Sequence, residues 1–191
     1  VLAIGLSGCQ GGFQTMGPSE YGAIFSALPR IIGGGLKARA LVPGEMEFIW
    51  PWETLYRFDT SVKAISWGGK MQGDNVLVED YVETRAFDGN EVGLAITVQY
   101  HIDPTKIQHV LQYVGDSDER VKQIVAALAR ADIRTHMNVL RTREFFSPDV
   151  LQESVEQVKK AINLRLNREG VIIDNIIYND HRFDQQYQQQ I

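Results

Sequence analysis

The sequence predicts an α+β fold: a small antiparallel sheet, then helices, then a return strand that leads into a C-terminal helix. Three observations predict it. Large apolar residues occupy every even position of Glu91–Ile102, which is the period-2 pattern of a strand with one buried face. From residue 103 the apolar period becomes 3.6, which indicates helices. After Gly170, the short β-branched run Val171–Tyr178 predicts a strand that returns to the sheet.

Shorter strands are expected before residue 91. Asp88-Gly89-Asn90 is a turn sequence that tolerates positive φ, so Tyr81–Phe87 is the expected hairpin partner of the long strand. Gly and Pro residues separate the earlier runs, which together suggest the small antiparallel sheet. These runs are Ala23–Phe25, Arg39–Val42, Glu47–Ile49, Thr54–Phe58 and Val62–Trp67.

Three helices are expected in the second half of the chain. Asp103-Pro104 begins the first helix, which ends at Gly115. Asp116 and Glu119 resemble a capping box at the start of the second. Ser147-Pro148-Asp149 begins the third, and Gly170 ends it. A C-terminal helix is expected from residue 181, because apolar residues four apart share one helical face. These residues are Phe183, Tyr187 and Ile191.

The composition excludes several classes of protein. The 191 residues carry 19 basic and 24 acidic side chains, for a net charge of -5. A nucleic-acid-binding domain usually carries a basic surface, so no nucleic acid partner is expected. The single cysteine, Cys9, excludes an internal disulfide and a cysteine-cluster zinc site. No apolar run reaches the length of about 18 residues that a complete membrane-spanning helix needs.

The sequence contains no recognisable catalytic or cofactor-binding constellation. His101, His109, His136 and His181 lack the spacing of a helical zinc site, and no Gly-x-Ser-x-Gly nucleophile motif occurs. Gly33-Gly34-Gly35-Leu36-Lys37 lacks the spacing of a phosphate-binding loop and is interpreted as a hairpin loop. We therefore expect a protein that is not an enzyme and that uses neither a metal nor another cofactor.

The N-terminal segment has the pattern of a membrane anchor. An apolar run ends in Leu6-Ser7-Gly8-Cys9, which resembles the lipobox of bacterial lipoproteins, in which the cysteine thiol accepts a diacylglyceryl chain. The alternatives are an uncleaved N-terminal anchor and a chance tetrapeptide. Either form of anchor implies a membrane-associated bacterial protein whose domain lies on the periplasmic side.

Two further groups of residues are candidates for contacts outside the chain. An aromatic group, Phe48, Trp50, Trp52 and Tyr56, either lies in the headgroup layer of a membrane or packs in the core around a proline-containing turn. A basic group, Arg120, Arg130, Arg134 and Arg141, is mixed with acidic residues on the helical half. It forms either a charged contact between neighbouring subunits or a solvated helix face.

The order and spacing of several motifs resemble the SPFH or band 7 family, which includes stomatins, prohibitins, flotillins and bacterial Hfl-type proteins. Pro43–Trp52 is similar to the family's proline-glycine, aromatic, proline signature, and Glu20-Tyr21-Gly22 to the opening that precedes it. Further matching segments are Asp59–Ser66, Asp88-Gly89-Asn90, Asp103-Pro104, Leu140–Glu144 and Gly170–Ile176. The resemblance covers residues 20–191 and is to a bacterial prohibitin-like member with a lipobox-like N-terminus.

The resemblance implies a domain organisation and a function. Residues 1–19 are then the anchor or signal tail with a linker, 20–180 the SPFH domain, and 181–191 the start of a truncated C-terminal helix or coiled coil. The implied function is a membrane-anchored scaffold that self-assembles into rings or cages and organises a membrane microdomain. The alternative is a prohibitin- or Hfl-type regulator that encloses a membrane AAA-type protease and controls substrate access. The expected partners are membrane lipid, a homo- or hetero-oligomer of SPFH subunits and, for the alternative, that protease.

Overall fold

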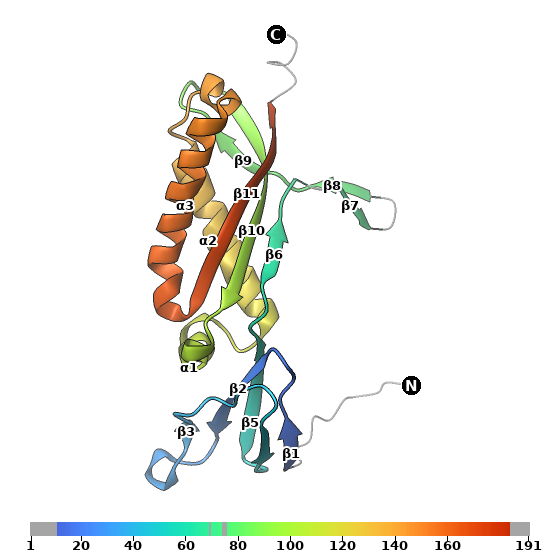
Figure 1. The fold of residues 1–191 in the computed structure, drawn as a ribbon, viewed down its shortest axis with the longest axis vertical. Helices are drawn as coiled ribbons and strands as arrows, with labels where there is room; N and C mark the ends of the chain where they lie inside the picture. The colour runs from blue at the N-terminus through green and yellow to red at the C-terminus, as the bar shows by residue number, and fades with distance from the viewer. Residues whose placement is uncertain (1–10, 69, 74–75, 184–191) are drawn as a thin grey trace. The chain divides into compact units, whose positions relative to one another are not determined.

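The chain folds into two compact units in the computed structural model, which describes residues 11–68, 70–73 and 76–183 (Figure 1). Unit 1 contains the chain up to Ser61 together with Ile102–Val121. Unit 2 contains Val62–His101 and the chain from Lys122 onward. The α+β fold class is confirmed. Leu6, Ser7, Gly8 and Cys9, the lipobox-like residues, lie outside the described residues.

Unit 1 contains two antiparallel sheets. Their strands are β1 (Gly12–Thr15), β2 (Glu20–Ser26), β3 (Gly35–Leu36), β4 (Met46–Ile49) and β5 (Glu53–Asp59). β1 pairs with β4, and the other sheet has the order β3-β2-β5. A small apolar core, formed by Met16, Ile24, Leu41 and Ile49 with Leu55 packed against it, lies within this unit.

The helical part of unit 1 is irregular. Asp103 caps it by accepting a hydrogen bond from the backbone N–H of Thr105 at 2.9 Å, as the Asp103-Pro104 sequence predicts. The expected helix then changes geometry along its length. It consists of a 3₁₀ turn, η2 (Pro104–Lys106), one α-helical turn, α1 (Ile107–His109), and a π-helical turn, η3 (Val110–Val114). One more 3₁₀ turn, η1 (Arg30–Ile32), follows β2.

Unit 2 is built on a four-stranded sheet. Its strands are β6 (Lys63–Ser66), β9 (Val82–Arg85), β10 (Glu91–Ile102) and β11 (Val171–Phe183). β10 is the central strand, and its even positions are all buried, which confirms the period-2 prediction. β9 pairs with it antiparallel through the predicted turn. A separate hairpin consists of β7 (Lys70–Gly73) and β8 (Val76–Glu79).

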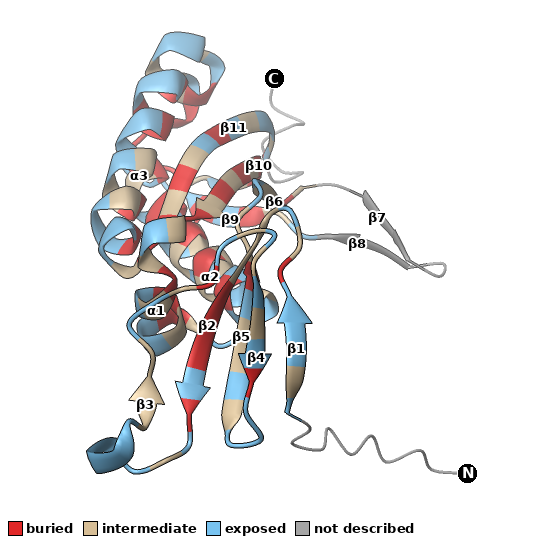
Figure 2. Cartoon of the chain, turned by 60° about the horizontal axis from the view of Figure 1, so that its bottom comes forward, coloured by how far each residue is buried: buried red, intermediate tan, exposed pale blue. Residues whose placement is uncertain are grey.

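Two long helices lie on the sheet of unit 2: α2 (Asp118–Met137), whose first turn belongs to unit 1, and α3 (Pro148–Glu169) (Figure 1). The short 3₁₀ helix η4 (Thr142–Phe146) connects them. α3 begins and ends as predicted: Pro148 is its first residue, and Gly170 ends it in the left-handed conformation at φ 91°. Its apolar stripe is buried, as Figure 2 shows in red.

Three expectations are wrong: one about a helix cap, one about a strand and one about how the strands form sheets. Asp116 does not cap α2, because the hydroxyl of Ser117 accepts the N–H of Arg120 instead, at 3.4 Å. Arg39–Val42 forms no strand and contributes one β-bridge, between Leu41 and Gly22. The early strands do not form one sheet: they divide between the two sheets of unit 1, while β6 joins the sheet of unit 2.

The C-terminal helix expected from residue 181 is also wrong for its first three residues. β11 continues through His181 to Phe183, five residues beyond the predicted end at Tyr178. The long β10 provides a partner for this extension, since Asn179 Nδ2 donates to Thr97 Oγ1 at 2.9 Å. Phe183 is buried and meets the ring of Phe145 edge-on. Tyr187 and Ile191, the other residues of the expected face, lie outside the described residues.

Candidate functional site

Four aromatic side chains form a continuous exposed row on unit 1, which we call the aromatic ladder: Phe13, Phe48, Trp50 and Trp52. Phe13 meets Phe48 edge-on at a centroid distance of 5.2 Å, and Phe48 meets Trp50 at 5.1 Å. Trp50 and Trp52 are stacked at 5.1 Å and 11°. All four are between 36% and 72% exposed. Such a contiguous exposed apolar row is typical of a contact surface rather than of an ordinary monomer surface.

Strand geometry accounts for the ladder. Phe13 on β1 and Phe48 on β4 are direct cross-strand partners, so their rings project from the same face. The turn after β4 is closed by hydrogen bonds at both ends. The Trp50 N–H donates to the Glu53 carboxylate at 3.2 Å, and the Glu53 N–H donates to the Trp50 carbonyl at 2.8 Å. The turn therefore has a fixed shape that leaves both tryptophans outside the core.

The structure places the side chains of the predicted aromatic group in different environments. Phe48, Trp50 and Trp52 are exposed, while the nearby Ile49 belongs to the buried core. Tyr56 does not join them: it lies in the middle of β5, opposite Ala23, and is half-buried. The sequence did not identify Phe13 as a member of this group, because its position beside Phe48 depends on a strand pairing that no local pattern predicts.

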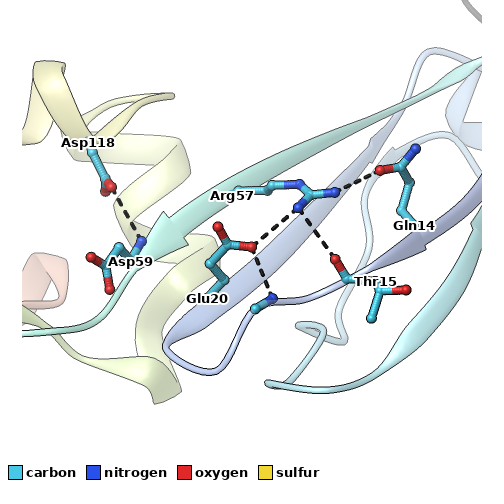
Figure 3. A network of polar contacts seen from close by, with 7 residues as sticks. Gln14, Thr15, Glu20, Arg57, Asp59 and Asp118 are labelled. Carbon is cyan, nitrogen blue, oxygen red and sulfur yellow. Dashed lines mark hydrogen bonds and ion pairs between the residues drawn. The ribbon is translucent and has the colours of Figure 1, made fainter.

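A polar cluster fastens β1, which carries Phe13, to the rest of unit 1 (Figure 3). The guanidinium of Arg57 on β5 donates to Gln14 Oε1 at 2.7 Å and to the Thr15 carbonyl at 3.4 Å. It also forms an ion pair with Glu20 at 3.2 Å, and Glu20 accepts the Gly17 N–H at 3.0 Å. Arg57 thus joins β1, β2 and β5, and it holds the strand that carries one end of the ladder.

The four arginines of the basic group do not form one cluster. Arg120 lies in unit 1, 3.6 Å from Asp116, whereas the other three lie in unit 2. Arg130 binds both carboxylate oxygens of Asp80 at 2.7 Å and lies over the ring of Trp67. Arg134 lines an open groove of about 740 Å³ beside β9, α2 and the end of β11. The groove also contains the ion pair between Arg85 and Glu91 at 3.5 Å.

Arg141 lies at the bend after α2. Hydrogen bonds join this bend to the turn between β9 and β10. Its guanidinium lies over the ring of Phe87, 5.7 Å from the centroid. The next residue, Thr142, donates its hydroxyl to Asp88 at 2.6 Å and its N–H to the same carboxylate at 3.0 Å. The hydroxyl hydrogen bond from Thr142 is the main cause that lowers the pKa of Asp88 below its ordinary value. This contact stabilises the Leu140–Glu144 bend.

The histidines have separate environments. His101 forms a 2.8 Å contact with Asp174, His109 stacks on Tyr113, and burial lowers the pKa of His181. Within residues 11–68, 70–73 and 76–183, no three His, Cys, Asp or Glu side chains lie together in a way that could hold a metal ion. In the same part of the chain, no helix is long and apolar enough to cross a membrane.

The family of the chain follows from its sequence and agrees with this fold. The sequence matches the model of the SPFH domain / Band 7 family over residues 14–191. The chain therefore belongs to the SPFH domain / Band 7 family. Members of this family are generally membrane-associated, non-enzymatic scaffolds that form oligomers at membranes. A comparison with curated proteins finds no match for the chain.

Proposed function

We propose that this protein is a membrane-anchored scaffold subunit whose unit 1 rests on a lipid bilayer through the aromatic ladder and whose copies self-assemble. The ladder is the observation that carries the proposal. Trp and Phe side chains favour the interface between headgroups and acyl chains, where the indole N–H stays hydrated while the ring is buried. Four such rings in one row, outside the core of a folded unit, match that environment.

The place where the N-terminal segment joins unit 1 supports the same orientation. Gly12, at the start of β1, pairs with Ile49, next to Trp50. The first strand of unit 1 therefore begins beside the ladder. In the sequence, an apolar run that ends in Cys9, the proposed site of lipid attachment, precedes this strand by two residues, Gln10 and Gly11. A lipid on Cys9 and the ladder would together give the two membrane contacts that stable anchoring requires.

Self-assembly is the second part of the proposal. Family membership over most of the chain supports it, because SPFH proteins generally form oligomers at membranes. Many weak contacts between neighbouring copies, each also held on the bilayer, would add through avidity. In the described residues, no surface by itself singles out a membrane protease, so the proposal ends at a scaffold.

Two measurements test the proposal. Flotation of the full chain with vesicles should recover it in the lipid fraction, and the Trp50→Ser/Trp52→Ser variant should bind at least about tenfold more weakly, because two buried rings are lost. Phe87→Ser/Tyr113→Ser is the matched control, since it removes two exposed aromatic residues away from the ladder. The detergent-extracted full chain should be a high-order oligomer. A monomer, or tryptophan variants that bind like the control, would contradict the corresponding part of the proposal.

A further inference from the structure

Two adjacent isoleucines on unit 1 have exposed side chains. Ile31 is 97% exposed and Ile32 is 64% exposed, both in the short turn η1 between β2 and β3. No residue of η1 is buried. Single exposed apolar residues are common, but two adjacent β-branched residues at the outermost point of a loop are unfavourable in water. This loop, Arg30–Ile32, contributes nothing to the core of unit 1.

The backbone of the loop is closely held, so the isoleucines are exposed by a defined structure. The Pro29 carbonyl accepts the N–H groups of Ile32 at 3.0 Å and of Gly34 at 3.1 Å. A Cβ atom on Gly34 would lie 1.5 Å from the Leu28 carbonyl oxygen, so only glycine fits there. The glycine run that resembled a phosphate loop therefore closes a tight turn and directs Ile31 and Ile32 outward.

The loop between β2 and β3 lies at the same end of unit 1 as the turn between β4 and β5, the segment that contains Trp50 and Trp52 (Figures 1 and 2). The Ala27 N–H, just before the loop, donates to the Trp52 carbonyl at 2.8 Å. Lys37, just after it, forms a 2.8 Å ion pair with Glu53, the residue that closes the tryptophan turn. The two elements are thus joined on both sides of the loop.

The charge of this region suits an anionic surface. Residues 21–44 contain three basic side chains, Arg30, Lys37 and Arg39, and no acidic one, in a chain whose net charge is -5. Lys37 and Arg39 form ion pairs with Glu53 and Glu45. Arg30 is exposed and has no acidic partner within ion-pair distance in the described part of the chain. A basic side chain beside two exposed isoleucines matches the boundary between lipid phosphates and acyl chains.

We propose that the Arg30–Ile32 loop is a second membrane-inserting element, selective for anionic lipid. Ile31 and Ile32 enter the acyl boundary, and Arg30 binds a lipid phosphate. The loop and the aromatic ladder then contact one bilayer at two points, which fixes the orientation of unit 1 as a single contact cannot. This inference rests on the proposed membrane contact of the ladder, and it adds a separate element and a lipid class to it.

The test compares variants of the full chain on two kinds of vesicle, phosphatidylcholine alone and phosphatidylcholine with phosphatidylglycerol. Every protein carries Cys9→Ser, so that an acyl chain on this sulfur cannot dominate binding. Ile31→Ser/Ile32→Ser should weaken binding to both vesicles about tenfold or more, because two apolar side chains no longer leave water. Arg30→Gln should weaken binding about fivefold on anionic vesicles only, and high salt should remove this difference.

Val139→Ser/Leu164→Ser is the matched control, since it removes two exposed apolar side chains from unit 2 and should leave binding unchanged. Circular dichroism should show that all variants keep the parent fold. If the isoleucine variant binds like this control while Trp50→Ser/Trp52→Ser is impaired, the loop proposal is wrong and the ladder proposal stands. If the parent does not bind either vesicle, the membrane contact of unit 1 is wrong as a whole. If Arg30→Gln weakens binding equally on both vesicles, the selectivity for anionic lipid is wrong.

Discussion

The two units differ in how far their large aromatic side chains are exposed. In unit 2, Trp67, Tyr100 and Phe145 are buried, and α2 and α3, which have 20 and 22 residues, lie on its sheet. In unit 1, the aromatic ladder and the Arg30–Ile32 loop are exposed, and within the described residues the only helical cover consists of short turns. Unit 2 therefore buries its largest aromatic side chains but leaves others exposed, such as Phe87 and Phe146, whereas unit 1 has four exposed aromatic side chains in one continuous row.

The difference also appears in what holds each unit together. Unit 2 relies on the burial of the even positions of β10 and the apolar stripe of α3. Unit 1 has a smaller aliphatic cluster, and its strand β1 is exposed at three of four positions and fastened by the polar contacts of Arg57. We expect substitutions in the two units to separate stability from surface function, and four predictions follow in order of effect.

The largest loss of unfolding free energy is expected for a substitution in the core of unit 2. Phe145 is 1% exposed, and its chain neighbour Phe146 is 58% exposed. Phe145→Ala should lower the free energy of unfolding by about 3–5 kcal/mol, because it leaves a cavity in a packed core. Phe146→Ala should cost less than about 1 kcal/mol. Denaturant unfolding measures both, and equal losses would show that unit 2 does not have the tightly packed core described here.

A smaller loss is expected when the polar contacts of unit 1 are removed. Arg57→Met keeps the aliphatic stem and removes three hydrogen bonds of the guanidinium. The expected cost is about 1–2 kcal/mol, reduced by the partial exposure of the ion pair. Hydrogen exchange should become faster at the β1 amides and stay unchanged in β10. Arg57→Lys keeps the positive charge but lacks the planar guanidinium and its several N–H donors. It should therefore recover only part of the lost unfolding free energy. Unchanged exchange in β1 would contradict the role of Arg57.

The bend of unit 2 should respond to pH. Thr142→Val removes the hydroxyl that binds Asp88 and should cost about 1 kcal/mol at neutral pH. Because the pKa of Asp88 is lowered in the folded state, its contribution is complete above the ordinary value of 3.8 and is lost as pH falls through the lowered pKa. The difference between wild type and Thr142→Val should therefore shrink in acid, as unfolding at neutral and acid pH measures. Thr142→Ser keeps the hydroxyl and should resemble wild type. If Thr142→Ser loses as much unfolding free energy as Thr142→Val, the effect comes from packing and not from the hydroxyl.

The smallest effect on stability is expected at the ladder. Trp52→Ser should change the free energy of unfolding by less than about 1 kcal/mol, since the side chain is 42% exposed, lies outside the core cluster of unit 1 and stacks on another exposed ring, Trp50. Phe58→Ala, in the same unit but fully buried, should cost about 3–5 kcal/mol. A large loss for Trp52→Ser would mean that the ladder serves the fold of unit 1 rather than a contact outside it.

Much of unit 2 was predictable because its signals are local. The alternation of β10, the Asp88-Gly89-Asn90 turn, and the Pro148 and Gly170 boundaries of α3 each depend on neighbouring residues only. One boundary error occurred where a more distant partner prevailed: β11 passed its predicted end because β10 is long enough to pair with it. The other was a local competition, in which Ser117 replaced its neighbour Asp116 as the cap of α2.

The sequence alone determined the family, the period of each main element and the presence of an aromatic group around Pro51. Only the tertiary structure decided that Phe48, Trp50 and Trp52 face outward, that Phe13 extends their row and that Ile31 and Ile32 lie at the same end. The reason is physical. A local pattern fixes which residues share a face, but strand pairings over long sequence separations decide whether another element covers that face.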